Sequence, residues 1–246
     1  MSFKTHLALS DGVGGWAPEY DPSLFSQALM YHYAQSASAS PSGACSKHLQ
    51  KAYDNTLTDS NVPAGSATAV AVSLSGNGDL KGINLGDSGL TVLRRAEPVY
   101  STSSQTHYFN CPYQLTKTPA DRSGENNVTD KPASADPIRF ALQPSDMVIM
   151  FTDGLSDNVP VEHLSILYNS VNQLMELPEN NHLSPQDKDA ERARIMADVL
   201  VAYGRMAMTR TGEEEGWKTP FQLEAKRHGY DFKGGKVDEY VNFLLR

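Results

Sequence analysis

This chain of 246 residues has few cysteines, no long apolar run and no excess of basic charge. Its two cysteines, Cys45 and Cys111, are too few for a disulfide framework or a cysteine-rich metal knuckle, so we expect two free thiols. No apolar window of about 18 residues is present, which excludes a helix that spans a membrane. The net charge of −8 argues against nucleic acid as the main partner.

Other common signals are also absent. The seven histidines show neither His-x-His nor His-x-x-x-His spacing, so we expect them to be surface or core residues. Neither a secretory signal nor a basic amphipathic presequence is found, and no targeting segment is expected within this sequence. With 39% hydrophobic residues the chain can bury a full core, and its length predicts one domain over residues 1–246.

A short apolar run, Leu7–Leu9, leads into Asp11 and Gly12. A strand that stops at Asp-Gly places a carboxylate at the edge of a sheet, beside backbone that can turn sharply. A hairpin turn is the alternative explanation for a single Asp-Gly pair. The same pattern, an Asp at the edge of an apolar or strand-like run, recurs at Asp87, Asp153 and Asp238.

Four carboxylates gathered at one end of a sheet would repel one another strongly. Each pair costs roughly 3 kcal/mol at about 5 Å with an effective dielectric constant of about 20. Such a cluster is stable only if cations lie within it. Because the donors are carboxylate and carbonyl oxygens without Cys or His, they favour Mg²⁺ or Mn²⁺ over zinc.

Hydrophobic periodicity predicts helices and strands in a mixed order. Asp21 and Pro22 form a helix start signal, and the small, polar segment 35–43 is predicted to be a loop. Further helices are predicted over 44–57, 161–177, 185–209 and 220–227, and strands over 66–74, 80–85, 90–93, 138–142, 147–152 and 241–245.

The turns between the strands at 66–74, 80–85 and 90–93 are short. Neighbouring strands joined in this way are antiparallel, which excludes a doubly wound parallel sheet in this region. The run 147–152 is apolar throughout, as in a strand covered on both faces, and it delivers Asp153. The polar segment near 116–137 is predicted to be a mobile loop.

Two other kinds of site have weaker support. Gly86–Gly89 resembles the tetrapeptide around a serine protease nucleophile, which would make Ser88 the nucleophile, but no histidine has a recognisable partner setting. The segment Gly229–Lys236 resembles a phosphate-binding loop, but the spacing is wrong and Val237 replaces the required Ser or Thr. A turn before the last strand is the simpler interpretation.

Six motifs in order resemble the metal-dependent type 2C protein Ser/Thr phosphatases, and two of them are closest to the mitochondrial and plastid branch. They are Asp-Gly-Val-Gly-Gly-Trp at 11–16, Gly-Ser-Ala-Thr-Ala at 65–69, Asn-Leu-Gly-Asp-Ser at 84–88, Phe-Asn-Cys-Pro-Tyr-Gln-Leu at 109–115, Thr-Asp-Gly-Leu-Ser-Asp-Asn at 152–158 and Gly-Gly-Lys-Val-Asp-Glu at 234–239. The resemblance implies an α+β fold of two stacked antiparallel sheets flanked by helices.

The resemblance also implies a metal site with two ions, Mn²⁺ or Mg²⁺, and a weaker third as an open alternative. Asp11 would bridge the two ions, the Gly12 carbonyl would hold one of them, and Asp153 and Asp238 would complete the second site. Asp87 would support the centre or bind the third ion. Asp11, Asp153 and Asp238 are thus the predicted catalytic residues, and the reaction would be attack of a metal-activated water on phosphoserine or phosphothreonine.

Relatives usually carry an acidic motif one strand before the Asp-Gly motif. Only ten residues precede Asp11 here, so we expect an N-terminally shortened fold without that strand. Two hypotheses remain open: an active phosphoprotein phosphatase, and a weak or inactive relative that binds phosphoproteins or a partner. The resemblance implies a phosphoprotein substrate and a mitochondrial location, with a cytoplasmic one as the alternative, and we expect a monomer.

Overall fold

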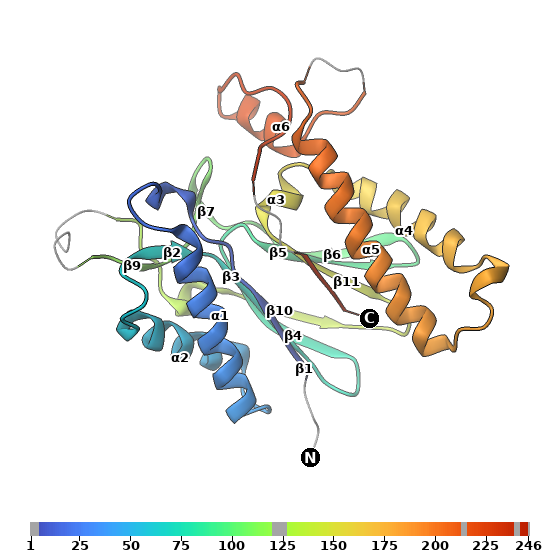
Figure 1. Ribbon diagram of the computed structural model, residues 1–246, viewed down its shortest axis with the longest axis horizontal. Coiled ribbons are helices and arrows are strands. Elements are labelled where there is room, and N and C mark those ends of the chain that lie inside the picture. Colours follow the sequence, from blue (N-terminus) through green and yellow to red (C-terminus); the bar gives the residue numbers. More distant parts are fainter. Residues whose placement is uncertain (1–4, 120–126, 213–215, 239–241, 246) are drawn as a thin grey trace. The chain divides into compact units, whose positions relative to one another are not determined.

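The computed structural model describes residues 5–119, 127–212, 216–238 and 242–245 (Figure 1). The chain divides into two compact units. Unit 1 comprises Met1–Gly89 and Thr102–Leu142, and unit 2 comprises Leu90–Ser101 and Gln143–Arg246. Each unit has its own four-stranded sheet and its own pair of long helices. The strand pairs β1–β3, β3–β4, β4–β10, β2–β9, β5–β6, β7–β8 and β11–β12 are antiparallel, which confirms the predicted α+β class with antiparallel sheets.

Unit 1 is built on a sheet with the strand order β1-β3-β4-β10. Its helices α1 and α2 pack on this sheet, because Phe25, Leu29 and Leu49 are fully buried and belong to the same core cluster as Ala71 and Ile83. The elements are β1 (Thr5–Leu9), η1 (Gly14–Trp16), α1 (Pro22–Ala39), α2 (Cys45–Thr58), β2 (Gly65–Ala67), β3 (Ala69–Leu74), β4 (Asp79–Leu85), β7 (Thr106–Tyr108), β8 (Cys111–Pro112), β9 (Leu115–Lys117), η3 (Pro132–Ser134) and β10 (Asp136–Ala141).

Unit 2 is built on a sheet with the strand order β12-β11-β5-β6. Met147–Met150 of β11 are all buried, which confirms the strand predicted to be covered on both faces. Leu200 and Met196 of α5 and Leu164 of α4 belong to the core cluster that includes β11. The elements are β5 (Gly89–Arg94), β6 (Glu97–Ser101), β11 (Met147–Phe151), α3 (Asp153–Ser156), α4 (Val161–Met175), η4 (Pro178–Asn180), α5 (Pro185–Met208), α6 (Pro220–Arg227) and β12 (Asn242–Leu245).

The start of α1 was predicted correctly and its end was not. The carboxylate of Asp21 accepts a hydrogen bond from the Ser23 amide (2.9 Å), and Pro22 opens the helix. However, residues 35–39, predicted to be a loop, continue the helix. Small residues can sustain a helix when they pack, and here Ser36 and Ala37 are buried, with Ser36 Oγ 2.9 Å from Nδ1 of His48 on α2.

The turn at Gly86–Ser88 does not form a hairpin between β4 and β5. β3 and β4 pair as predicted, but β5 lies in the sheet of unit 2, so the prediction that β4 and β5 are antiparallel neighbours is wrong. Gly86 has φ of 101°, a conformation that glycine tolerates and that lets the chain leave one sheet and enter another. The strand predicted over 66–74 is likewise divided, at Thr68, into β2 and β3.

Both cysteines are free, as predicted, and both are buried. The single domain predicted over residues 1–246 stays a prediction. The mobility predicted near 116–137 also stays a prediction. Residues 120–126 lie outside the described part of the chain, while the end of β9, η3 and the first residues of β10 lie within the segment.

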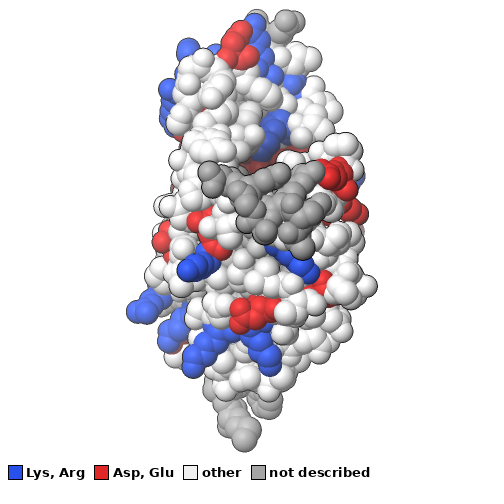
Figure 2. Space-filling model, turned by 90° about the vertical axis from the view of Figure 1, so that its left-hand side faces the viewer, with Lys and Arg blue, Asp and Glu red and all other residues white. Residues whose placement is uncertain are grey.

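None of the described helices is both long and apolar enough to cross a membrane. Acidic and basic side chains are interspersed over the face shown in Figure 2.

In unit 2, Asp146 ties the turn before β11 to β5. Its carboxylate, which is 1% exposed, accepts hydrogen bonds from Arg94 Nε (2.9 Å) and Nη2 (2.7 Å) and from the Gln143 amide (2.8 Å). Burial alone would raise the pKa of Asp146, but the bonds from Arg94 and Gln143 outweigh it and hold that pKa below its usual value.

Replacing this carboxylate should therefore destabilise the fold in a pH-dependent manner. We expect Asp146→Asn to lower the free energy of unfolding at neutral pH by about 2–3 kcal/mol, because buried donors lose a charged acceptor. A lowered pKa in the folded state contributes stability above the unfolded pKa and loses it as the pH falls, so the difference should shrink below about pH 4. Urea unfolding at several pH values measures this, with exposed Asp231→Asn as the control; a pH-independent difference would contradict it.

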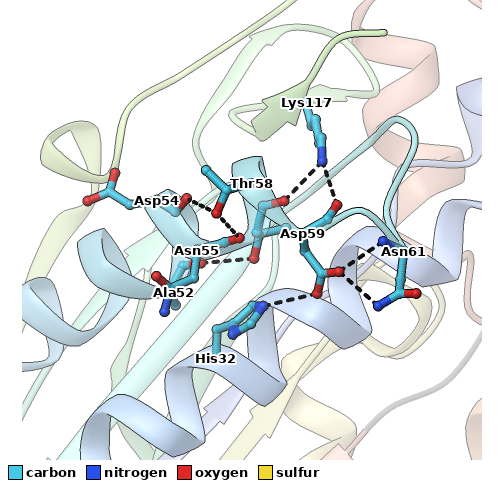
Figure 3. Close-up of polar contacts among 9 residues, drawn as sticks. His32, Ala52, Asp54, Asn55, Thr58, Asp59, Asn61 and Lys117 are labelled. Carbon is cyan, nitrogen blue, oxygen red and sulfur yellow. Dashed lines mark hydrogen bonds and ion pairs between the residues drawn. The ribbon is translucent and has the colours of Figure 1, made fainter.

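In unit 1, Lys117 of β9 closes the C-terminal end of α2 (Figure 3). Its ammonium donates to the carbonyl oxygens of Asp59 (2.7 Å) and Thr56 (3.4 Å). The Asp59 carboxylate in turn accepts from the Asn61 amide (2.9 Å) and contacts His32 Nε2 of α1 (3.2 Å). A cation at a helix C-terminus is favourable because it satisfies the last carbonyls and opposes the partial negative charge there.

We expect Lys117→Met to lower the free energy of unfolding by about 1 kcal/mol, since two carbonyls lose their donor while the apolar stem is retained. Lys51→Met, an exposed position on the same helix, is the control and should have little effect. Urea unfolding midpoints of the two variants compare them directly; equal midpoints would show that the Lys117 contact contributes nothing.

Candidate metal centre

Asp11 lies in a loop that is held along its backbone by the segment before β3. The Asp11 amide donates to Thr68 Oγ1 (3.2 Å), and the Thr68 amide donates to the Asp11 carbonyl (3.0 Å). Gly12 forms a bridge with Ala67, and the Val13 amide donates to the Ser66 carbonyl. The half-buried carboxylate of Asp11 is therefore carried on a fixed backbone just beyond the end of β1.

Gly12 is required by its neighbours rather than by its φ angle. A Cβ atom at this position would lie 2.2 Å from the carbonyl oxygen of Pro22, the first residue of α1. Backbone atoms cannot yield as a flexible side chain can, so the loop and the start of α1 approach this closely only with glycine. The sequence reasoning explained this glycine by a turn, and the close approach could not be seen without the fold.

Asp87 lies on the loop between β4 and β5, and Gln105 holds this loop through two hydrogen bonds. The Gln105 amide donates to the Gly86 carbonyl (2.9 Å), and the Gly86 amide donates to Gln105 Oε1 (3.2 Å). Ser88 Oγ lies 2.7 Å from Thr68 Oγ1. Thr68 therefore contacts both the Asp11 loop and the Asp87 loop, and it is a site residue that the sequence reasoning missed.

The structure removes the serine-nucleophile alternative. Ser88 is 1% exposed, and its hydroxyl is bonded to the hydroxyl of Thr68, which is not a general base. A buried serine in this setting cannot meet a substrate. Its contact joins two loops of unit 1.

In unit 2, Asp153 follows β11 and is the first residue of the short helix α3. Asn158, which is fully buried, connects this segment to the chain before β12. Its Nδ2 donates to the carbonyls of Gly154 (3.0 Å) and Lys236 (2.8 Å), and its Oδ1 accepts from the Lys236 amide (2.8 Å). Residues almost 80 positions apart in sequence are thereby held in register.

Three carboxylates of unit 2 surround one ammonium group. Lys236 Nζ lies 2.5 Å from Asp153 Oδ2, 2.7 Å from Asp157 Oδ2 and 3.2 Å from Asp238 Oδ2. The prediction named Asp153 and Asp238 but not Asp157 or Lys236. The available signals were the second Asp in Thr-Asp-Gly-Leu-Ser-Asp and the Lys two residues before Asp238, neither of which reveals a contact by spacing alone.

The electrostatics of this cluster follow from burial and repulsion. The pKa of Asp157 is raised to about 6, chiefly by burial; Lys236 opposes this rise, and the neighbouring charges of Asp153 and Asp238 add to it. For Lys236, burial lowers the pKa, but the nearby carboxylates of Asp157 and Asp153 outweigh it, so the net pKa is raised. The ammonium is thus firmly protonated.

The predicted ligands in each unit carry oxygen donors, the kind of donor that a hard divalent ion prefers. In unit 2, Asp153 and Asp238 both reach a single cation, which shows that their carboxylates converge. All donors are oxygen atoms, as Mg²⁺ and Mn²⁺ require. The described residues include no group of three or more His, Cys, Asp or Glu side chains arranged to hold a metal ion. Asp11 and Asp87 belong to unit 1. Glu239, the last residue of the Gly-Gly-Lys-Val-Asp-Glu motif, lies outside the described residues.

Comparison with known proteins identifies relatives along nearly the whole chain. No family model matches. The chain is 34% identical to the 5-azacytidine resistance protein azr1 of Schizosaccharomyces pombe, over 94% of this chain and 74% of that protein. It is 32% identical to the protein phosphatase PTC7 homolog fig of Drosophila yakuba (97% and 70%) and 33% identical to the probable protein phosphatase 2C 55 of Arabidopsis thaliana (95% and 44%).

A solved structure shows the same fold. The photosystem II phosphatase PBCP matches with a TM-score of 0.73 and 24% identity, over 98% of this chain and 89% of that one. The match extends over almost all of both chains, so the two proteins share one fold.

The close approach at Gly12 gives a paired test. We expect Gly12→Ala to lower the free energy of unfolding by about 1–3 kcal/mol, because the new methyl group forces the loop away from Pro22. Gly14→Ala, two residues later, meets nothing within 4 Å and should be nearly neutral. Thermal denaturation of both variants measures the difference; equal stability would mean that the loop does not pack on α1 in solution.

Proposed function

This chain belongs to the metal-dependent type 2C family of protein Ser/Thr phosphatases, and from that premise we propose that Asp11, Asp153 and Asp238 are its metal-binding carboxylates. The observation that carries the family is the identity of 32% to a PTC7 phosphatase homologue across 97% of this chain. The chain is accordingly a protein Ser/Thr phosphatase that depends on metal. The alternative of an inactive binding module is not favoured, because relatives that match most of the chain are named as phosphatases.

The proposed ligand set consists of oxygen donors from four acidic residues and one backbone carbonyl. Its members are Asp11, the Gly12 carbonyl, Asp87, Asp153 and Asp238. Support comes from the convergence of Asp153 and Asp238 on one cation, and from the backbone bonds that fix the Asp11 loop. We propose two ions, Mn²⁺ or Mg²⁺, with Asp11 shared between them and Asp87 reserved for support or a weaker third ion.

The metal ions and the protein side chains have different roles in the proposed catalysis. Divalent ions, when bound, lower the pKa of a water nucleophile and neutralise phosphate charge. The chain's own contribution is to hold its carboxylates in place. Thr68 orients the Asp11 loop through the Asp11 amide, Asn158 bonds the carbonyl of Gly154 next to Asp153, and Lys236 bonds the Asp153 carboxylate. None of these residues needs to form a covalent bond with the phosphoryl group, so the proposed reaction is direct hydrolysis.

The substrate class is phosphoserine or phosphothreonine in proteins. A monomer without a nucleic-acid partner is proposed from the acidic net charge of −8. The resemblance to PTC7-type relatives supports a mitochondrial location, with a cytoplasmic one as the alternative. Fractionation of cells that express the full gene product distinguishes these two compartments.

The metal requirement is tested with Mn²⁺ titration and p-nitrophenyl phosphate turnover on the same samples. We expect Asp153→Asn to weaken Mn²⁺ binding by at least about 10-fold and to reduce turnover to background, because a charged ligand is lost. Asp198→Asn, an exposed carboxylate of α5 in the same unit, is the control and should match the unchanged protein. Turnover that persists in chelator, or in Asp153→Asn, would contradict the proposed function.

A further inference from the structure

Lys236 has no role in the proposed ligand set, yet several contacts hold both its backbone and its side chain. Both backbone groups of Lys236 are bonded to the side chain of buried Asn158. Its ammonium lies 5.1 Å from the centre of the Phe221 ring, and its side chain is only 17% exposed. Ordering and burying a lysine in this way costs conformational entropy and solvation, so the contacts that it makes must offset both.

The charges around Lys236 are unequal. Three carboxylates and one ammonium leave a formal charge of −2, which equals the charge that one divalent ion would neutralise. Without the ammonium the three carboxylates would repel one another by roughly 3 kcal/mol per pair at about 5 Å and an effective dielectric constant of about 20. With it, they can remain together before any metal arrives.

We propose that Lys236 is a built-in counter-cation of the metal centre: it gathers Asp153 and Asp238 in the metal-free protein and weakens metal binding by opposing the charge of the incoming ion. This inference rests on the proposed function, in which those two carboxylates are ligands. Lys236 is a positioning residue in this account, because it acts through the carboxylates and touches no substrate.

Two opposite effects follow from removing the ammonium. The metal-free protein loses the attraction that holds three carboxylates together, so it becomes less stable. A divalent ion then meets a site of charge −3 instead of −2 and no longer has a positive neighbour, so it binds more tightly. A purely structural salt bridge would give the first effect without the second, and the metal affinity would fall as the ligands became disordered.

The test measures Mn²⁺ binding by calorimetry and by electron paramagnetic resonance of free Mn²⁺, at mildly alkaline pH and without substrate. We expect Lys236→Met, which keeps most of the apolar stem, to bind Mn²⁺ at least about 10-fold more tightly than the unchanged protein. Its melting temperature should be lower without metal, and the rise on adding saturating Mn²⁺ should be larger. Lys236→Arg keeps the charge and should remain within about threefold of the unchanged protein.

A charge-compensation variant keeps the test valid if Lys236→Met does not fold. Asp157→Asn alone should weaken Mn²⁺ binding by at least about fivefold, because one negative charge is removed. Lys236→Met combined with Asp157→Asn restores the formal charge of −2, and the affinity should return to within about threefold of the unchanged protein. A double variant that binds as weakly as Asp157→Asn would overturn the proposal.

The outcomes separate this inference from the proposed function. Mn²⁺ binding to the unchanged protein, together with unchanged or weaker binding to Lys236→Met, overturns the role of Lys236 and leaves the function in place. If neither the unchanged protein nor Lys236→Met binds Mn²⁺, both the role of Lys236 and the proposed function are overturned. Tighter binding to Lys236→Met with a lower melting temperature in the absence of metal supports the counter-cation role.

Discussion

Repulsion between carboxylates is the constraint on which the architecture of unit 2 depends. Asp153, Asp157 and Asp238 come from the beginning of α3, its end and the chain before β12, and they face one another across a single ammonium. Each pair would cost several kcal/mol if no cation were present. The fully buried Asn158 fixes the backbone that carries Lys236, and the ammonium lies 5.1 Å from the centre of the Phe221 ring. Much of the local structure thus serves to keep one positive charge in place.

Unit 1 holds its two acidic loops in place with hydroxyl groups and backbone pairing. Thr68 interrupts the predicted strand between β2 and β3, and at that break its amide and hydroxyl bind the Asp11 backbone while its hydroxyl also contacts Ser88. Glycine at position 12 permits the approach to Pro22, and glycine at position 86 permits the chain to leave the sheet. Because these contacts are made by backbone and small side chains, they hold the acidic loops without adding charge to them.

Local sequence signals predicted the elements whose causes are local. Asp21 and Pro22 marked the start of α1 because capping depends on adjacent residues, and the apolar run before Asp153 marked β11. Segments whose structure depends on distant partners were predicted less well. Residues 35–39 became helical through burial against α2, and β5 joined the sheet of β11 instead of pairing with β4.

The site residues show the same contrast between local signals and contacts with distant residues. Motif order and the resemblance pointed to Asp153 and Asp238, and the structure brings these two together; Asp11 and Asp87 are carried on braced loops of unit 1, and the ligand roles of all four remain proposals. Thr68, Asn158, Asp157 and Lys236 could not be recognised in advance, because their roles come from contacts between residues distant in sequence. Lys236 was interpreted as part of a failed phosphate loop and of the last motif, since nothing in that segment reveals the carboxylates that reach it from the two ends of α3.

The central claim is that these carboxylates exist to bind divalent cations, and diffraction from crystals grown with Mn²⁺ tests it most directly. Data collected at the manganese absorption edge locate the metal independently of the protein atoms. The account predicts anomalous density within coordination distance of Asp11, Asp153 and Asp238, at two positions in each chain. Density confined to other surface carboxylates, with Asp153 and Asp238 contacting only Lys236 in Mn²⁺-saturated crystals, would contradict it.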